Sequence, residues 1–98
     1  MLDSLQQAKI TQAICKRLGI VIDPELGRNV IEMGLICMVE VDVSGAVEIT
    51  MTTTFEGCPA ASFLVEGVRA SAAKVDGVTD VSVALTYEPR WQPQMMAS

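Results

Sequence analysis

The chain has no histidine, and its three cysteines, Cys15, Cys37 and Cys58, are widely spaced along the sequence. An odd number of cysteines argues against the disulfide framework of a small secreted protein. The absence of Cys-x-x-Cys motifs and of Cys/His pairs argues against a closed structural zinc site within one chain. Because the sequence contains no histidine, any chemistry at one of these thiols would proceed without an imidazole partner.

Long apolar runs and clusters of basic residues are also absent from the sequence. No run reaches the roughly 18–20 residues that span a membrane, and residues 1–7 lack the basic start and apolar block of a signal peptide. Lys and Arg number 7 against 12 Asp and Glu, a net charge of -5. Because phosphate backbones are bound by concentrated positive charge, nucleic acid is not expected as a partner. We expect a cytoplasmic protein with no membrane partner.

The residues that are present predict a single folded domain over residues 1–98. With 98 residues, of which 50% are hydrophobic, the chain is long and apolar enough to bury a core. It contains no linker rich in Pro or Ser that would divide it into two domains. Residues 21–27 are predicted to form a capped turn or a short helical piece, and residues 88–98 a tail that contains prolines. Apolar periodicity and the positions of Gly and Pro predict two helices, over 4–18 and 59–75, and three strands, over 35–42, 46–54 and 79–87.

The order helix–strand–strand–helix–strand predicts an α+β fold, a two-layer α/β sandwich. Its three-stranded mixed sheet is expected to carry the helices on one face and to leave the other face open. Alternation places Cys37 and Leu85 on the covered, apolar face. In the second predicted strand, Thr52 and Thr54 alternate with Met51 and Thr53, and they are expected on the open, polar face.

The register of the first two strands follows from this alternation. A three-residue loop, 43–45, with Gly45 in the left-handed region keeps apolar residues on one face. It pairs Asp42 with Ala46 and Leu35 with Thr53. The crossover helix makes the third strand parallel to the second. The segment 23–34, the turn 54–58 and the chain beyond residue 87 should therefore meet at one end of the sheet.

Cys58 lies between Gly57 and Pro59, where a strand is expected to pass into a helix. Proline is favoured at the first helical position, which places Cys58 at or beside the N-cap. There, unpaired N–H groups and the helix dipole stabilise a thiolate. Ser, Thr, Asp and Asn are better caps than Cys, so the position favours a role for the sulfur itself. A purely structural role in the turn is the alternative.

Other residues at the same end are candidates for the site, each with a structural alternative. Asp23 and Glu25 can be polar partners of the sulfur or of a bound metal, or can simply cap a turn. Thr52 and Thr54 lie near the strand end, and strand propensity also explains them. Trp91, the only tryptophan, is interpreted first as an anchor of the tail and second as a contact for a partner protein.

The two remaining cysteines are interpreted as packing residues. Cys37 alternates with apolar strand residues and is expected to be a small buried hydrophobe. Cys15 lies in the middle of the first predicted helix, where a packed or half-exposed position is expected. Neither is a candidate ligand.

Four motifs then occur in the order seen in SufT/PaaD-like domains: Asp23-Pro24-Glu25-Leu26, Asn29 to Ile36, Thr52-x-Thr54-x-x-Gly57-Cys58-Pro59 and Pro89-x-Trp91. The chain resembles this family of small iron–sulfur assembly-associated domains over nearly its whole length after residue 10. The family was long catalogued as a domain of unknown function. The resemblance implies an α-β-β-α-β fold and a role in cytosolic iron–sulfur protein maturation, with Cys58 as the motif cysteine and Asp23 as the motif acid.

The chain also departs from the family pattern. Glu32-Met33-Gly34 stands where the family commonly has Asp-Leu-Gly, and Arg90 stands in a Pro-Pro-Trp position. The cysteine-rich extension of PaaD-like proteins and the P-loop of ATP-dependent cluster carriers are not found in the sequence. A role in an oxygenase system or as such a carrier is therefore not expected.

Three hypotheses of function result. The first is a non-enzymatic accessory protein that acts through Cys58 in iron–sulfur cluster assembly or transfer, with the assembly machinery or apo client proteins as partners. A cluster is normally held by four thiolates, so Cys58 would share iron or a cluster transiently with a homodimer partner or a client, and no stable cofactor is expected on the monomer. The second is a thiol redox or catalytic protein. The third is an adaptor without a metal role, which docks through the open face or the Trp91 tail.

Overall fold

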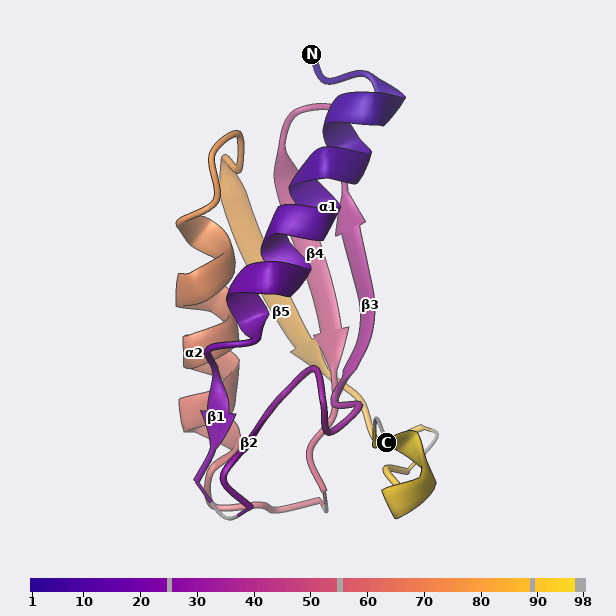
Figure 1. The fold of residues 1–98 in the computed structure, drawn as a ribbon, viewed down its shortest axis with the longest axis vertical. Helices are drawn as coiled ribbons and strands as arrows, with labels where there is room; N and C mark the ends of the chain where they lie inside the picture. Colours follow the sequence, from indigo (N-terminus) through magenta and orange to yellow (C-terminus); the bar gives the residue numbers. More distant parts are fainter. Residues whose placement is uncertain (25, 55, 89, 97–98) are drawn as a thin grey trace.

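The computed structural model describes residues 1–24, 26–54, 56–88 and 90–96. Strands β3, β4 and β5 form a sheet in that order, with β3 antiparallel and β5 parallel to β4. Helices α1 and α2 lie side by side on one face of this sheet (Figure 1). The predicted α+β fold with a three-stranded mixed sheet is therefore confirmed. Its elements are α1 (Ser4–Leu18), β1 (Ile22–Asp23), β2 (Arg28–Asn29), β3 (Ile36–Val41), β4 (Ala46–Met51), α2 (Ala61–Ala73), β5 (Asp80–Leu85) and the 3₁₀ helix η1 (Pro93–Met95).

Helix α1 begins and ends where the sequence predicts. The Asp3 side chain accepts a hydrogen bond from the Gln6 N–H, and the Gln6 side chain accepts one from the Asp3 N–H, which is a capping box. Gly19 ends the helix, and the stripe of Ile10, Ile14 and Leu18 is buried. This stripe, one residue per turn, holds the helix on the sheet.

The core lies between the two helices and the sheet. Every second side chain of the central strand β4 is apolar and points toward the helices. These side chains pack against apolar residues of α2 that recur at helical spacing. The buried apolar residues of these two elements are Val47, Ile49, Met51, Leu64, Val68 and Ala72. No helix among the described residues is long and apolar enough to cross a membrane.

The predicted register is right near the loop and wrong at the far end of β3. Gly45 has a φ of 89°, and the Asp42 N–H donates to the Ala46 carbonyl at 3.0 Å, as expected. Between Ile36 and Met38, however, the register shifts by one residue. The Leu35 carbonyl consequently accepts from the Thr52 N–H, at 2.8 Å, and the predicted pairing of Leu35 with Thr53 is wrong.

The shift is a β-bulge at Cys37, and it corrects a second prediction. The extra residue interrupts the alternation of faces, and Cys37 is exposed, although it was expected to be buried. Cys15 is half-buried, as expected. The prediction that Leu85 packs in the core is also wrong, because its side chain is 42% exposed at the end of edge strand β5.

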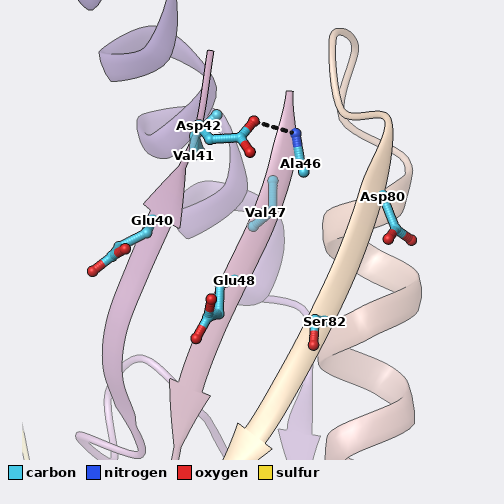
Figure 2. A pocket seen from close by; sticks show the side chains of 8 residues that line it. All are labelled: Glu40, Val41, Asp42, Ala46, Val47, Glu48, Asp80 and Ser82. Atoms are coloured by element: carbon cyan, nitrogen blue, oxygen red, sulfur yellow. Dashed lines mark hydrogen bonds between the residues drawn. The ribbon is translucent and has the colours of Figure 1, made fainter. Parts of the chain in front are cut away.

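The open face of the sheet is polar, as predicted. Figure 2 shows Glu40, Glu48, Asp80 and Ser82 projecting from three neighbouring strands over a shallow pocket. Thr52 differs from the prediction: strand β4 ends at Met51, so the alternation no longer applies beyond it, and Thr52 is fully buried.

Candidate functional site

Residues 21–27 were predicted to form a capped turn or a short helical piece, but residues 22–29 form a small β-hairpin instead. Ile22 pairs with Asn29 and Asp23 with Arg28, and the Gly27 N–H donates to the Asp23 carbonyl at 2.8 Å. Pro24 favours extended backbone at the preceding residue, and Gly27 has a φ of 67°, which lets the chain reverse. The hairpin places the Asp23 side chain in a buried position, 1% exposed.

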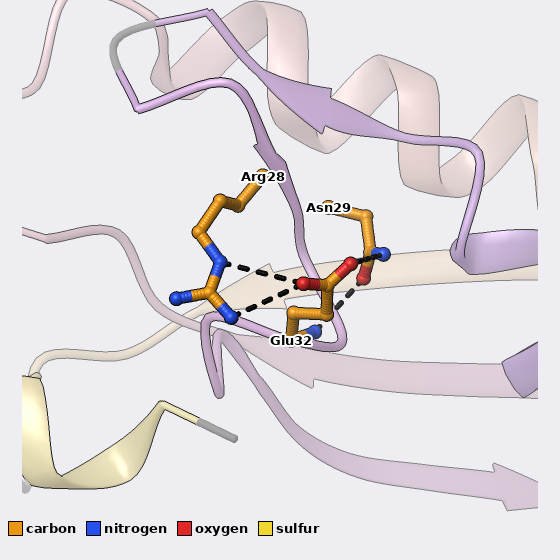
Figure 3. Close-up of polar contacts among 3 residues, drawn as sticks. All are labelled: Arg28, Asn29 and Glu32. Carbon is orange, nitrogen blue, oxygen red and sulfur yellow. Dashed lines mark hydrogen bonds and ion pairs between the residues drawn. The ribbon is translucent and has the colours of Figure 1, made fainter. Parts of the chain in front are cut away.

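A compact turn joins the hairpin to β3 and is held by side chains. The Asn29 Oδ1 accepts from the Glu32 N–H at 2.8 Å, and the Asn29 amide donates to the Glu32 carboxylate. The Arg28 guanidinium donates to the other carboxylate oxygen of Glu32, as Figure 3 shows. These bonds fix the backbone that carries Met33 into the core, where it is fully buried.

The C-terminal tail docks on this turn through Trp91. Its indole N–H donates to the Met33 carbonyl at 2.5 Å, and its ring packs against the core. Gly34 lies next to Met95, since a Cβ added at Gly34 would clash with the Met95 carbonyl oxygen. Trp91 therefore anchors the tail, which was its first interpretation from the sequence. Its second, contact with a partner protein, stays a prediction.

The chain after β4 buries two threonines in succession. Thr52 and Thr53 are 0% and 1% exposed. The Thr53 hydroxyl lies 2.9 Å from the Tyr87 hydroxyl, which joins the end of β4 to the segment after β5. Thr54 follows and is half-buried at the surface. Glu25 lies outside the described residues.

Cys58 lies in a turn before α2, and it is not at the N-cap. The Ala61 N–H donates to the Cys58 carbonyl at 3.0 Å, and Ala60 has φ −86° and ψ 0°. Those angles and the i to i+3 bond match a type I turn with Pro59 at its favoured second position. The N-cap is Ala60, so the prediction that Pro59 starts the helix is wrong by two residues. The Cys58 side chain is buried, with 4% of its surface exposed.

A groove of about 180 Å³ opens beside these buried residues. Glu56 and Arg90 give it one charge of each sign, and Tyr87 and Trp91 give it aromatic walls. Thr54 completes the lining, whereas Asp23, Thr52 and Cys58 are not among the described residues that line it. The predicted site residues thus form two groups: Thr54 and Trp91 line the surface groove, whereas Asp23, Thr52 and Cys58 are buried.

The three predicted segments do meet at one end of the sheet. Figure 1 shows the β1–β2 hairpin, the loop before α2 and the C-terminal tail together at the end where β4 and β5 terminate. The Trp91–Met33 and Thr53–Tyr87 hydrogen bonds join these segments directly. Tyr87 was expected at this end, but its bond to Thr53 was not predicted, because the sequence pattern does not give the partner of a phenol.

The donor set is incomplete for a metal cluster. Within residues 1–24, 26–54, 56–88 and 90–96, no three His, Cys, Asp or Glu side chains come together as metal ligands. Thiolate is the ligand that iron–sulfur clusters prefer, and Cys58 is the one buried cysteine. The described residues alone therefore do not supply the ligand set of a resident cluster.

Comparisons with known proteins place the chain among iron–sulfur assembly proteins. A family model described as "Iron-sulfur cluster assembly protein" matches residues 11–85. The chain is 45% identical over 84 residues to an "Fe-S protein maturation auxiliary factor" of Porphyromonas gingivalis, covering 86% of this chain and 80% of that protein. It is 35% identical over 77 residues to the "Fe-S protein maturation auxiliary factor SufT" of Staphylococcus aureus, covering 79% and 88%.

The fold is also that of a solved structure. The crystal structure of a "Domain of Unknown Function DUF59" from Bacillus anthracis aligns with a TM-score of 0.91 and 31% identity, covering 97% of this chain and 91% of that one. The resemblance in the sequence motifs, the fold and the family model agree. The chain belongs to the SufT/PaaD-like family of iron–sulfur cluster assembly proteins.

Proposed function

We propose that this protein is a non-enzymatic accessory factor that helps to assemble iron–sulfur clusters or to transfer them to apo client proteins. The iron or cluster is its cargo, and Cys58 is the ligand that this chain supplies. The observation that carries the proposal is one buried thiol at the end of the sheet where three segments converge, in a chain whose relatives are named maturation factors.

Ligand number supports a shared rather than a resident site. A cluster takes about four thiolates, and Cys37, which is exposed, lies on β3 rather than in the turn before α2. The remaining ligands would come from a client, from the assembly machinery or from a second copy of the chain. Transient binding of this kind matches an accessory role, because a fully ligated cluster would leave slowly.

Burial of Cys58 adds a requirement to the mechanism. With 4% of the residue exposed, the sulfur reaches another molecule only if the turn around it moves. Gly57, the residue before Cys58, has a φ of 84°, and a Cβ added there would meet no atom within 4 Å. The backbone next to Cys58 therefore has open space beside it. Local opening of a surface turn costs less than global unfolding, which makes such a step compatible with a stable domain.

The test is cluster transfer to apo-aconitase after anaerobic reconstitution with iron and sulfide, read by aconitase activity. We expect Cys58→Ser and Cys58→Ala to abolish the increase in transfer rate that the wild-type protein gives. Cys37→Ser is the matched control, since it removes an exposed thiol from the same domain and should transfer normally. Circular dichroism verifies that each variant is folded.

If Cys58→Ser and Cys58→Ala transfer clusters as fast as the wild-type protein, Cys58 is not the ligand and this mechanism is wrong. Loss of transfer in Cys37→Ser alone would assign the role to the exposed thiol. A pull-down of apo-aconitase with Cys58→Ser separates loss of the ligand from loss of docking, because an adaptor without a metal role would retain both binding and function.

A further inference from the structure

A groove between α1 and the C-terminal end of α2 is surrounded by cations. Its volume is about 480 Å³, and its floor is apolar. Four basic side chains line it, and Asp76 is its one acidic residue among those described. The basic residues are Lys9, Lys16, Arg17 and Lys74, and the floor is formed by Ile10, Ala13 and Val75.

Helix geometry explains the shape of this groove. Lys9, Ala13 and Lys16 follow one another at spacings of four and three, so they share one face of α1. The small side chain of Ala13 leaves a hollow between the two longer ones. The turn after α2 packs closely at Ile10, since a Cβ at Gly77 would lie 2.9 Å from the Ile10 Cδ1.

The four cations are not neutralised by an ion pair within the described part of the chain. The ion pairs found there are Arg28–Glu32 and Arg69–Glu66, and neither involves the groove. Helix α1 contains three basic residues and no acidic one. Four of the 7 basic residues of a chain with net charge -5 therefore surround one hollow.

The helix dipole accounts for part of this arrangement. Lys16 and Arg17 lie in the last turn of α1, and Lys74 is the C-cap of α2, positions at which a cation is favourable. The dipole does not account for Lys9 in the middle of α1. Nor does it account for four cations around the groove with Asp76 as the single carboxylate among its described lining residues.

We propose that this groove docks an acidic amphipathic segment of a partner protein, such as a helix with apolar residues on one face and carboxylates beside them. The apolar side chains would lie on Ile10, Ala13 and Val75, and the carboxylates would meet the four cations. A nucleic acid fits less well, because its phosphates would leave the floor uncovered and the rest of the chain is acidic. Helical docking in a groove is an established mode of peptide recognition.

The position of the groove makes this proposal independent of Cys58. Helix α2 has 13 residues, which is roughly 20 Å of length at 1.5 Å per residue. The turn with Cys58 precedes α2, whereas Lys74, Val75 and Asp76 of the groove follow it, so the two lie beyond opposite ends of the helix. A partner held in the groove would leave the thiol end of the molecule accessible to a cargo.

The probe is a fluorescein-labelled 14-residue peptide with leucines at helical spacing on one face and glutamates elsewhere, measured by fluorescence anisotropy. Lys16→Glu should weaken binding about fivefold or more, because one attraction becomes a repulsion of similar size. Arg69→Glu is the matched control: it makes the same change of net charge on an exposed α2 residue outside the groove and should change affinity little. Ala13→Phe, which fills the hollow, should weaken binding without any change of charge.

Competing peptides decide what the groove recognises. A scrambled peptide of the same composition should bind less tightly than the amphipathic one, and chemical-shift changes should map to residues 9–17 and 74–76. The proposal is overturned if the amphipathic peptide does not bind, if the scrambled peptide or a single-stranded oligonucleotide binds as tightly, or if Lys16→Glu and Arg69→Glu have equal effects. None of these outcomes depends on cluster transfer, so the docking proposal can fail while the proposed function stands.

Discussion

At the scale of single residues, one extra residue in β3 exposes to solvent a thiol that the strand pattern predicts to be buried. The bulge at Cys37 exposes that side chain, and partial desolvation by its surroundings raises the pKa of its thiol. Cys58, in a turn, is buried. The sequence could not predict the bulge, because Ile36, Cys37 and Met38 are all apolar and give no break in the pattern at which to place the extra residue.

Asp42 is the residue whose ionisation should show in stability. Its Oδ1 accepts from the Ser44 Oγ at 2.6 Å, the Ser44 N–H at 2.8 Å and the Ala46 N–H at 3.0 Å. These bonds, that from the Ser44 hydroxyl most of all, hold the pKa of Asp42 below its ordinary value. The ionised form is thus favoured in the folded state.

The stabilisation by Asp42 is present above the ordinary aspartate pKa, about 3.9, and is lost as the pH falls through the lowered folded-state pKa. We expect Asp42→Ala to have a lower Tm than the wild-type protein at pH 7, and the difference to shrink as the pH falls below about 4. Ser44→Ala should reproduce part of this effect. Thermal unfolding across a pH series measures both, and a difference that stays constant with pH would contradict the explanation.

At the scale of elements, the contact between the turn at Gly34 and the C-terminal tail could not be predicted from the sequence. Strand and helix positions followed from periodicity, and the start of α1 from its capping residue. The β1–β2 hairpin was missed because its strands have two residues each, too few for alternation to be visible. The start of α2 was misplaced because proline is favoured both at the first helical position and at the second position of a type I turn.

Gly34→Ala should destabilise the protein and release the tail. Its φ is 70°, and an added Cβ would meet the Met95 carbonyl. Backbone strain alone should cost roughly 1–3 kcal/mol, and the steric clash should add to it. Gly27→Ala is the control, because its φ of 67° brings similar strain with no atom within 4 Å.

Urea unfolding gives the two free energies of unfolding, and the emission of Trp91, the only tryptophan, reports the tail. We expect a larger loss of stability in Gly34→Ala and a shift of its native-state emission that Gly27→Ala lacks. Equal losses with unchanged emission in both variants would show that the Met95 contact contributes nothing.

At the scale of the whole molecule, the core depends on the buried face of α2 more than on its exposed aromatic residue. Leu64 is fully buried, whereas its neighbour Phe63 is 62% exposed. We expect Leu64→Ala to lower the free energy of unfolding by about 2–5 kcal/mol, and Phe63→Ala to lower it by less than about 0.5 kcal/mol. Denaturant unfolding compares the pair; a Phe63→Ala loss as large as that of Leu64→Ala would mean that Phe63 is buried in solution by another molecule.

Topology and the convergence of three segments were predictable at this scale, and the charged groove was not. Strand order and crossover follow from general rules of chain connection, so the end of the sheet that carries Cys58 could be placed from the sequence. Lys9 and Lys74 are 65 positions apart, and nothing in a local pattern brings them together. The depth at which Thr52 and Asp23 lie was equally hidden, because it depends on where β4 ends and on how the hairpin packs.

The tail contact also sets an order for synthesis. Tyr87 and Trp91 leave the ribosome after Asp23, Thr53 and Cys58, yet they supply the phenol that meets Thr53 and the indole that holds the Met33 carbonyl. A nascent chain that has completed α2 and is still translating β5 lacks both contacts. The end of the sheet that carries Cys58 is therefore completed last, because both contacts form only after the chain has been synthesised beyond β5 as far as Trp91.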